Sequence, residues 1–188
     1  MLNTIVITGP PGSGKTIQAR LLAEKTGYRL FSPGERYRDI ATKDTSLGKR
    51  VRETIGAGYL GPYWLSVYLF QDAVFHIEHT DGIIFEGVGR KEEEARVFDE
   101  TMEWLKREYR VIDISVGEDT IIERLTRRRD IESRDDDDPE DIPVRIKEYE
   151  KHTVPATEFF KSVNKYIRIR GEQTVEEVHN DIVQALNR

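Results

Sequence analysis

The stretch that most constrains this chain lies at residues 9–16, which read GPPGSGKT. It follows an apolar run at residues 5–7 and fits the pattern G-x-x-x-x-G-K-[ST] with nothing missing. Glycines reach backbone angles closed to other residues, so successive N–H groups can turn inward around a polyphosphate. We expect Lys15 to bridge the β- and γ-phosphates, Thr16 to offer its hydroxyl to Mg²⁺, and the following helix to face the anion with its positive end. The stretch is therefore predicted to cradle a polyphosphate.

Strand-like segments alternate with helical patterns along the chain. The strand signals fall at residues 5–8, 29–31, 83–85, 111–116 and 166–169. Such alternation implies a mostly parallel sheet covered by helices on both faces, with ligands at the carboxyl ends of the strands. We predict an α/β fold with three layers, α/β/α, around a mostly five-stranded parallel sheet. With 188 residues, 37% of them hydrophobic, the chain is predicted to form one domain.

Composition argues against several classes of protein. The chain has no cysteine, which rules out disulfides and thiolate metal sites, and its four histidines give only one His-x-x-His pair, at His76 and His79. We interpret that pair as part of a helix face in water and predict no zinc site. A net charge of −6 argues against non-specific binding to nucleic acid. No segment approaches the ~20 apolar residues of a membrane span, and no signal-like region precedes the first strand, so we expect a cytoplasmic protein without membrane association.

Two helical segments are interpreted as packing elements. Near the C-terminus, Thr174 and Glu177 have the spacing of a helix capping box. Four apolar residues of that helix share one face: Val175, Val178, Ile182 and Leu186. Residues 62–77 carry six large apolar side chains: Trp64, Leu65, Tyr68, Leu69, Val74 and Phe75. We expect this segment to be a largely buried helix, with its aromatic residues in the core rather than against a ligand.

Two polar stretches interrupt the layered pattern. Residues 32–61 contain five glycines and predict a pair of short helices, inserted after the second strand, that can move. Residues 127–138 combine a basic run with four aspartates, which could instead form a solvated acidic face capping the next helix. Arginines stand near strand ends and helix starts: Arg38, Arg90, Arg124, Arg128, Arg134 and Arg145. Guanidinium groups suit phosphate oxygens, although each arginine taken alone could equally be a solvated surface residue.

Together these segments resemble the adenylate kinase family of nucleoside monophosphate kinases, over nearly the whole chain. Residues 12–19 are similar to the family's ATP-phosphate loop, residues 31–38 to the start of its monophosphate-binding insertion, and residues 57–60 to the turn beneath the acceptor base. Residues 85–90, FEGVGR, resemble its Asp-Gly-Phe-Pro-Arg motif. The arginine and aspartate spacing further on is similar to the family's lid. Only five residues separate Arg128 from Arg134, so the resemblance implies the short-lid type.

The resemblance implies a P-loop NTPase fold: a single kinase domain, 1–188, with a monophosphate-binding insertion at about 32–61 and a short lid at about 128–137. It implies transfer of the γ-phosphoryl group of ATP to a nucleoside monophosphate, with Mg²⁺ on the donor phosphates and no zinc. The implied catalytic residues are Lys15, Arg90, Arg124, Arg128, Arg134 and Arg145.

The resemblance also assigns the binding residues. ATP is expected at Gly12, Ser13, Gly14, Lys15, Thr16, Ile17, Arg124, Arg128 and Gln173. The monophosphate is expected at Pro33, Gly34, Arg38, Tyr59, Leu60, Gly61, Gly87, Arg90, Glu94, Arg134 and Arg145. Mg²⁺ is expected at Thr16 and Glu86, partly through water, and Asp136 and Asp137 are expected to pair with lid arginines.

The acceptor base is the least constrained part of the prediction. Pro33 stands where the family has a threonine that helps hold adenine, and Glu94 stands where it has a base-reading glutamine. An ionised glutamate can only accept hydrogen bonds, which favours guanine or cytosine, whereas the overall resemblance favours AMP. We expect AMP, with GMP or CMP as alternatives, and a monomer that binds small nucleotides. A kinase for another small metabolite and a slow ATP-dependent switch or assembly factor are the other hypotheses.

Overall fold

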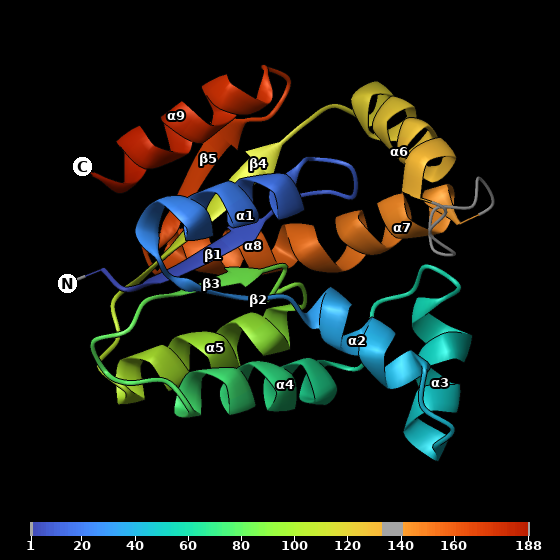
Figure 1. Ribbon diagram of the computed structural model, residues 1–188, viewed down its shortest axis with the longest axis horizontal. Helices are drawn as coiled ribbons and strands as arrows, with labels where there is room; N and C mark the ends of the chain where they lie inside the picture. The colour runs from blue at the N-terminus through green and yellow to red at the C-terminus, as the bar shows by residue number, and fades with distance from the viewer. Residues whose placement is uncertain (1, 133–140, 188) are drawn as a thin grey trace.

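Figure 1 shows the computed structural model of the chain, which describes residues 2–132 and 141–187 and, for residues 128–132, the backbone alone. Its centre is one sheet of five parallel strands in the order β2-β3-β1-β4-β5. The strands are β1 (Thr4–Thr8), β2 (Arg29–Phe31), β3 (Ile83–Glu86), β4 (Tyr109–Ser115) and β5 (Tyr166–Arg170). Each predicted strand segment is confirmed, and so is the parallel sheet.

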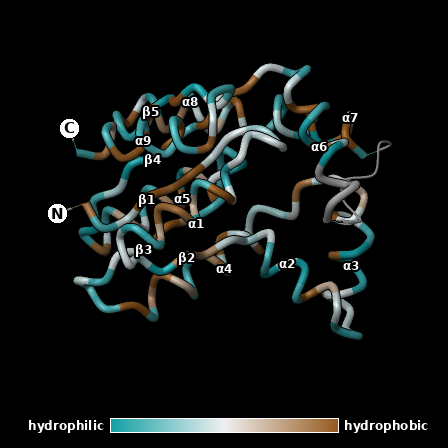
Figure 2. The backbone as a smooth tube through the Cα atoms, turned by 45° about the horizontal axis from the view of Figure 1, so that its top comes forward, coloured by the Kyte–Doolittle hydropathy of each residue, from teal (hydrophilic) through white to brown (hydrophobic). Residues whose placement is uncertain are grey.

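Helices cover both faces of this sheet. One face carries α1 (Lys15–Thr26) and α9 (Val175–Leu186), and the other carries α4 (Tyr63–Phe75), α5 (Glu92–Trp104) and α8 (Val154–Ser162). Successive strand residues point to opposite faces, so Ile5 and Ile7 pack with α1 and α9 while Val6 packs with α4, α5 and α8. Figure 2 accordingly shows β1 as a hydrophobic strand in the middle of the fold. The predicted three-layer α/β/α fold is confirmed.

The remaining helices flank the carboxyl ends of the strands. Helices α2 (Pro33–Ala41) and α3 (Ser46–Ile55) follow β2 and are the pair of short helices expected within residues 32–61. Tyr37 of α2 and Val51 of α3 form a small buried cluster with two leucines of α4. Helix α6 (Glu118–Glu132) follows β4, and α7 (Ile142–Glu148) leads through a π-helical segment (Tyr149–Thr153) into α8. The insertion thus rests on the main core through α4.

The C-terminal helix forms as its capping residues predict. The Thr174 hydroxyl accepts a hydrogen bond from the Glu177 N–H, and the Glu177 carboxylate accepts one from the Thr174 N–H, so the capping box is confirmed. Val178 and Ile182 are buried against the sheet. Val175, predicted on the same apolar face, is instead exposed, because it lies in the first turn beyond the edge of this contact.

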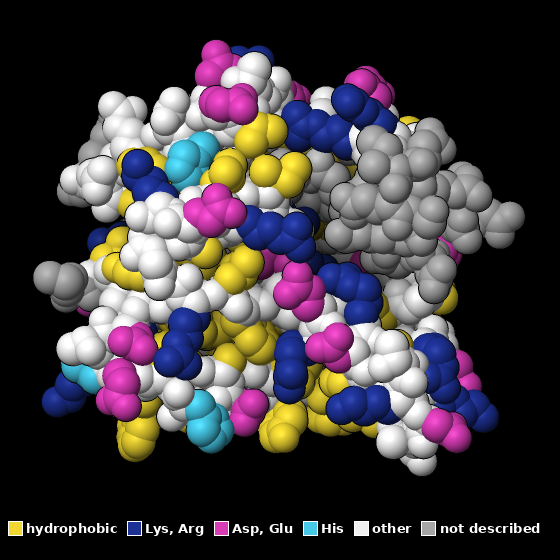
Figure 3. All heavy atoms as spheres, in the orientation of Figure 1, with side chains coloured by type: hydrophobic (Ala, Val, Ile, Leu, Met, Phe, Trp, Pro, Cys, Tyr) yellow, Lys and Arg dark blue, Asp and Glu magenta, His cyan; other side chains and the backbone are white. Residues whose placement is uncertain are grey.

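The prediction that the aromatic residues of α4 are buried is wrong for all three that it named, Trp64, Tyr68 and Phe75. Helix α4 turns only one face to the sheet and α5, through Phe70 and Val74 among others. The three aromatics recur at helical spacing on another face, where Tyr68 is 64% exposed. Figure 3 shows hydrophobic side chains at the surface over α4 and α5. Apolar content alone did not reveal which faces of the helix have neighbours.

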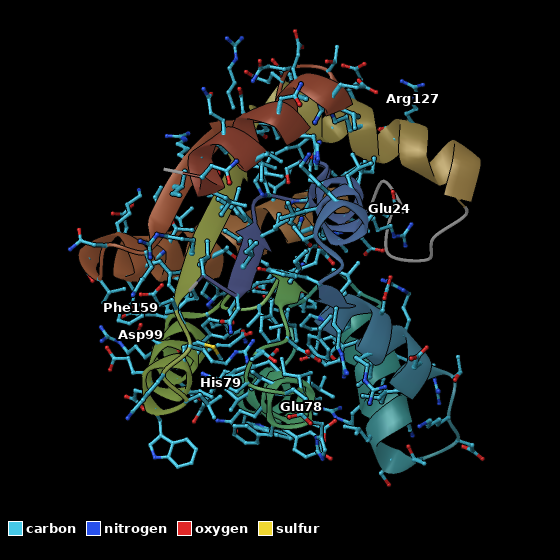
Figure 4. The ribbon with its side chains drawn as sticks, turned by 60° about the vertical axis from the view of Figure 1, so that its left-hand side comes forward. Glu24, Glu78, His79, Asp99, Arg127 and Phe159 are labelled. Carbon is cyan, nitrogen blue, oxygen red and sulfur yellow. The ribbon has the colours of Figure 1, made fainter. Side chains whose placement is uncertain are left out.

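The histidine pair lies at the amino ends of the strands, away from the phosphate loop. His76 is the C-cap of α4, His79, labelled in Figure 4, stands in the loop before β3, and both are exposed. The backbone carbonyls of Glu78 and His79 accept hydrogen bonds from Arg107. Within residues 2–132 and 141–187, no group of three or more His, Cys, Asp or Glu residues could hold a metal ion. Over the same residues, every helix is too short or too polar to cross a membrane.

Candidate functional site

A tight loop joins the end of β1 to the start of α1. Gly9 has a φ of 144°, and a side chain there would lie 2.5 Å from the carbonyl oxygen of Ile114. The ammonium of Lys15 is buried and donates a hydrogen bond to the carbonyl oxygen of Pro10, with an Nζ–O distance of 2.9 Å. The Ser13 hydroxyl is buried without a hydrogen-bond partner among the described residues. A cation inside a turn of glycines, beside an unsatisfied hydroxyl at a helix N-terminus, suits a bound anion.

Of three further residues expected near ATP, Arg124 and Ile17 adjoin this loop, and Gln173 contacts residues at the end of β5 and in α9. The guanidinium of Arg124, on α6, donates to the carbonyl oxygens of Gly171 and Ser13 at 2.9 and 3.5 Å. It therefore joins α6 and the loop after β5 to the phosphate loop. Gln173 lies in the loop before α9 and donates to the Asp181 carboxylate at 2.8 Å. Ile17, in the first turn of α1, has an exposed side chain.

A buried carboxylate, Glu86, stands at the carboxyl end of β3. The Ser32 hydroxyl donates to its Oε2 at 2.6 Å. Burial by itself would raise the pKa of this carboxyl. The pKa of Glu86 is nevertheless lowered below its ordinary value, because the charges of Lys15 and Arg90 lie close by, and the Ser32 hydrogen bond and the charge of Arg38 act in the same direction. The site thus holds an ionised carboxylate among cations.

The loop after β3 turns back over itself. Gly87 has a φ of 80°, and a side chain there would lie 2.5 Å from an Nη atom of Arg90. The guanidinium of Arg90 therefore lies where a side chain at residue 87 would project, and only glycine is compatible with this packing. The Glu94 carboxylate accepts hydrogen bonds from the N–H groups of Gly89 (2.8 Å) and Arg90 (3.3 Å). Glu94, in the first turn of α5, thus fixes the loop after β3. These hydrogen bonds to the loop were not predicted from sequence.

A cavity of about 650 Å³ connects these groups. Fourteen of the predicted site residues line it: Gly12, Lys15, Thr16, Pro33, Gly34, Arg38, Tyr59, Leu60, Gly61, Glu86, Gly87, Arg90, Glu94 and Arg145. It runs from the phosphate loop to the space between α2, α3 and the start of α5. Figure 3 shows Lys and Arg side chains gathered over the region between α1 and α2. Phosphate-loop residues and expected acceptor residues therefore share one continuous space.

Sequence reasoning missed a polar pair in the wall of this cavity. The hydroxyls of Tyr37 on α2 and Ser66 on α4 are hydrogen bonded at 2.7 Å, and both residues are buried. Burial raises the pKa of Tyr37 to about 12. Arg52 of α3 also lines the cavity. Tyr37 and Ser66 lie on helices whose sequences suggest ordinary packing. The pair becomes apparent only when the structure brings α2 close to α4.

The turn at residues 58–61 meets the helix that carries Arg145. The Leu60 N–H donates to the Glu148 carboxylate at 3.1 Å. A side chain at Gly58 would lie 3.1 Å from Cγ of Arg145, so the turn and α7 are in close contact. The insertion is thus joined to α7 beside the cavity.

Part of the predicted lid falls outside the described structure. Residues 134, 136 and 137, which carry Arg134, Asp136 and Asp137, are among the positions that the structure does not describe, and of Arg128 only the backbone is described, in α6. Their predicted roles are therefore not assessed by the geometry.

Comparison with known proteins supports one family. The family model for adenylate kinase matches residues 7–165. A protein from Azobacteroides pseudotrichonymphae named adenylate kinase is 34% identical, over 100% of this chain and 98% of its own length. Proteins with the same name from Phocaeicola vulgatus and Thermus thermophilus are 33% and 32% identical, over 100% and 97% of this chain and 100% and 96% of their own lengths.

Proposed function

The chain belongs to the adenylate kinase family, and on this premise we propose that it is a phosphotransferase that moves the γ-phosphoryl group of ATP to AMP, giving two ADP. The observation that carries the proposal is the continuous cavity from Lys15 to the turn at residues 58–61. Such a space can hold a donor polyphosphate and an acceptor phosphate end to end. Transfer between two phosphates needs alignment and charge stabilisation, with no covalent enzyme intermediate.

The donor phosphates are proposed to bind in the loop between β1 and α1. Its backbone N–H groups, at Gly12, Ser13 and Gly14, would surround the phosphate oxygens, and the positive end of α1 faces them. Lys15 would leave the Pro10 carbonyl to bridge the β- and γ-phosphates. Arg124 supports a position for the rest of ATP between the phosphate loop and α6, because its guanidinium contacts backbone on both sides. Ile17 and Gln173 are proposed to border that nucleotide.

The acceptor is proposed to bind between α2, α3 and the loop after β3. Arg38 and Arg90 would hold its phosphate, because guanidinium groups make charge-assisted bonds to phosphate oxygens. The residues proposed around the nucleoside are Pro33, Gly34, Tyr59, Leu60, Gly61, Gly87 and Glu94. Two arginines on the acceptor reduce the repulsion between its phosphate and that of ATP as the oxygens approach. The transferred group would then sit near Lys15 and Arg90.

Mg²⁺ is proposed to accompany ATP. Thr16 would supply a hydroxyl and Glu86 a carboxylate, in part through water, and both line the cavity. The donor set fits a hard cation, because the pKa of Glu86 is lowered and its carboxylate is therefore ionised. When bound, the ion neutralises charge on the donor phosphates. The chain's own contribution is to hold these oxygens beside Lys15.

The remaining proposals concern closure and context. Residues 32–61 and 128–137 are proposed to close over the substrates as insertion and short lid. Closure would bring Arg128, Arg134 and Arg145 to the transferred group, and Asp136 and Asp137 would pair with lid arginines. We further propose that the protein works as a cytoplasmic monomer on small nucleotides, without nucleic acid, membrane or zinc.

A panel of acceptors tests the proposed function. The protein is incubated with ATP, Mg²⁺ and one of AMP, GMP, CMP, UMP or dTMP, and the diphosphate formed is measured. AMP is expected to give the fastest transfer, with GMP or CMP next. ATP loss at one slow rate, whatever monophosphate is present, would instead indicate a nucleotide-dependent switch.

A further inference from the structure

Three polar side chains converge on the acceptor end of the cavity from three helices. Tyr37 of α2 and Ser66 of α4 share a hydrogen bond, and Glu94 of α5 lines the same space with only 2% of its surface exposed. The charge of Glu94 acts on the pKa of Tyr37, and both residues line the cavity. Residues that contact a base in a cavity of this kind determine which hydrogen-bonding edge it accepts.

The Glu94 carboxylate keeps some hydrogen-bonding capacity for a ligand. Its Oε1 accepts a hydrogen bond from the Gly89 N–H and its Oε2 accepts one from the Arg90 N–H. The Lys91 N–H is a third backbone donor to the carboxylate and, like the other two, lowers its pKa. A carboxylate offers about four acceptor positions, so three backbone donors leave one. A protonated carboxyl has one O–H donor in place of that last acceptor position. The backbone contacts therefore fix the orientation of the carboxyl group while leaving it able to accept or, once protonated, to donate.

Both protonation states of Glu94 are accessible near neutrality. Burial raises its pKa to about 7, against the opposing effect of the Gly89, Arg90 and Lys91 N–H groups and the Arg90 charge. Two other groups lining the cavity do not change state there, because the pKa of Tyr37 is raised to about 12 and that of Glu86 is lowered. The other cations that line the cavity are Lys15, Arg38, Arg52, Lys91 and Arg145.

The two states present different partners to a base. A neutral carboxyl can donate its O–H to N1 of adenine, the contact that a glutamine amide makes through its N–H. A carboxylate can only accept, which suits guanine, whose N1–H and amino group are both donors. The Tyr37–Ser66 pair can serve either base, because each hydroxyl can donate or accept.

Resting on the proposed function, we propose that the proton on Glu94 sets the choice of acceptor base: the neutral carboxyl selects AMP, and the carboxylate shifts preference toward GMP. Glu94 thus replaces a fixed amide with a titratable reader of the base edge. The backbone N–H groups that hold the carboxyl are common to both states, so the switch needs no rearrangement of the loop after β3.

The unmodified protein provides the first test. The dissociation constants of AMP and GMP are measured by calorimetry between about pH 5.5 and 8.5, on either side of the pKa of about 7. Both ligands carry the same phosphate, so the effect of its ionisation cancels in the ratio of their dissociation constants. The preference for AMP over GMP is expected to fall about fivefold or more as pH rises, with a midpoint near 7, since one hydrogen bond to the base is exchanged.

Proton linkage gives an independent readout. Near neutral pH, AMP binding should take up more protons than GMP binding, and the difference appears when each titration is repeated in buffers of different ionisation enthalpy. Glu94→Gln should remove this difference and hold the AMP-to-GMP ratio constant with pH. Glu93→Gln is the matched control, because Glu93 is the exposed neighbour in the same helical turn, and it should retain the full pH dependence.

The outcomes separate this inference from the proposed function. A constant AMP-to-GMP ratio in the unmodified protein, with AMP still phosphorylated, would overturn the role of the Glu94 proton alone. A pH dependence that persists in Glu94→Gln would overturn it as well, by assigning the titration to another group. If Glu94→Gln does not fold, the pH dependence and proton difference of the unmodified protein still decide. Failure to phosphorylate AMP at every pH would reject the proposed function and this inference with it.

Discussion

The ammonium of Lys15 illustrates how single residues are positioned for chemistry before any substrate arrives. It is buried in the first turn of α1, and its hydrogen bond to the Pro10 carbonyl holds it inside the phosphate loop. Glu86 is positioned in the same way, by the Ser32 hydroxyl. Charges in a site of low exposure interact with a bound anion more strongly than solvated ones, and the proposed move of Lys15 from the Pro10 carbonyl to phosphate oxygens stays within the same loop.

Replacing Lys15 by methionine should nearly abolish phosphoryl transfer. It removes the cation proposed for the β- and γ-phosphates, and losing a transition-state contact of this kind typically costs ~3 kcal/mol or more, about a hundredfold in rate. Steady-state assays with ATP and AMP measure the effect, and circular dichroism checks the fold. Lys25→Met, at the exposed end of the same helix, is the control and should keep normal turnover. Normal turnover in Lys15→Met would contradict the donor site.

Glu94 should also make stability depend on pH. Its folded-state pKa of about 7 exceeds the ordinary 4.5, so between these values the folded protein binds more protons than the unfolded chain. The contribution of this group to the free energy of unfolding is fully present below about pH 4.5 and is lost as pH rises through about 7, by roughly 3 kcal/mol. Urea unfolding of the unmodified protein and Glu94→Gln across that range measures the difference. A difference that stays constant with pH would contradict the burial argument.

At the residue level, the structure brings together residues that a local motif predicted to be close. The glycine-rich loop with Lys15 could be recognised from eight consecutive residues, and Arg38 and Arg90 do line the cavity. Sequence reasoning failed for contacts made between elements. Nothing local to Tyr37 indicates that Ser66, 29 positions away, supplies its hydrogen bond. Glu94 was expected to face a base, and its contacts with backbone N–H groups emerge only once the loop after β3 has folded back.

At the scale of elements, periodicity was sufficient for the sheet and for most helices. Strand residues such as Ile83, Ile84 and Phe85 are apolar on both faces because helices cover both sides of the sheet, which is why continuous apolar runs marked the strands. The same reasoning overestimated the burial of α4. A helix at the edge of a layer leaves one face in solvent, and its exposed aromatics then resemble core residues in the sequence.

The insertion should become ordered when both nucleotides bind. The buried cluster that joins it to α4 consists of Tyr37 and Val51 with Leu65 and Leu69 of α4, so α2 and α3 are expected to open more easily than the main sheet. A two-headed ATP–AMP mimic should slow amide hydrogen exchange in α2, α3 and residues 128–137, while α9, outside the cavity, serves as the internal control. Unchanged exchange in both segments would leave no role for closure.

The contact between Glu148 and the turn at residues 58–61 should support acceptor binding. Glu148→Ala removes the acceptor of the Leu60 N–H, which loosens the turn and should raise the KM for AMP about fivefold, the value of one hydrogen bond. The KM for ATP should stay unchanged. Glu148→Gln, whose amide oxygen can still accept, should restore most of the affinity, and Glu150→Ala is the exposed control. Equal KM values for AMP in Glu148→Ala and the unmodified protein would show that the contact is not used.

At the scale of the whole molecule, one sheet supports both the packed core and the candidate site. Its faces carry the core, and the carboxyl ends of its strands carry the site. The cluster of α4, α5 and α8 is aromatic: Phe98 makes edge-to-face contacts with Phe70, Phe85 and Tyr109 at centroid distances of 5.2 to 5.4 Å. The loops at the carboxyl ends of the strands carry the charged groups. A rigid sheet can thus hold the phosphate loop and the loop after β3 at a constant separation while the outer helices move.

Because the core and the site occupy different parts of the sheet, a core substitution should lower stability without changing ligand binding. Phe98→Ala should lower the free energy of unfolding by about 3–5 kcal/mol, because it leaves a cavity among three aromatic rings in a residue that is fully buried. Trp104→Ala, in the same helix but 81% exposed, should change it by no more than about 0.5 kcal/mol. A two-headed ATP–AMP mimic at a hundredfold excess over its dissociation constant should then add about 2.7 kcal/mol to each folded variant, since it binds only the folded state. Urea unfolding with and without the mimic measures both quantities. Loss of the mimic's increment in Phe98→Ala alone would mean that the aromatic cluster shapes the site directly, and that core and site cannot be treated as separate.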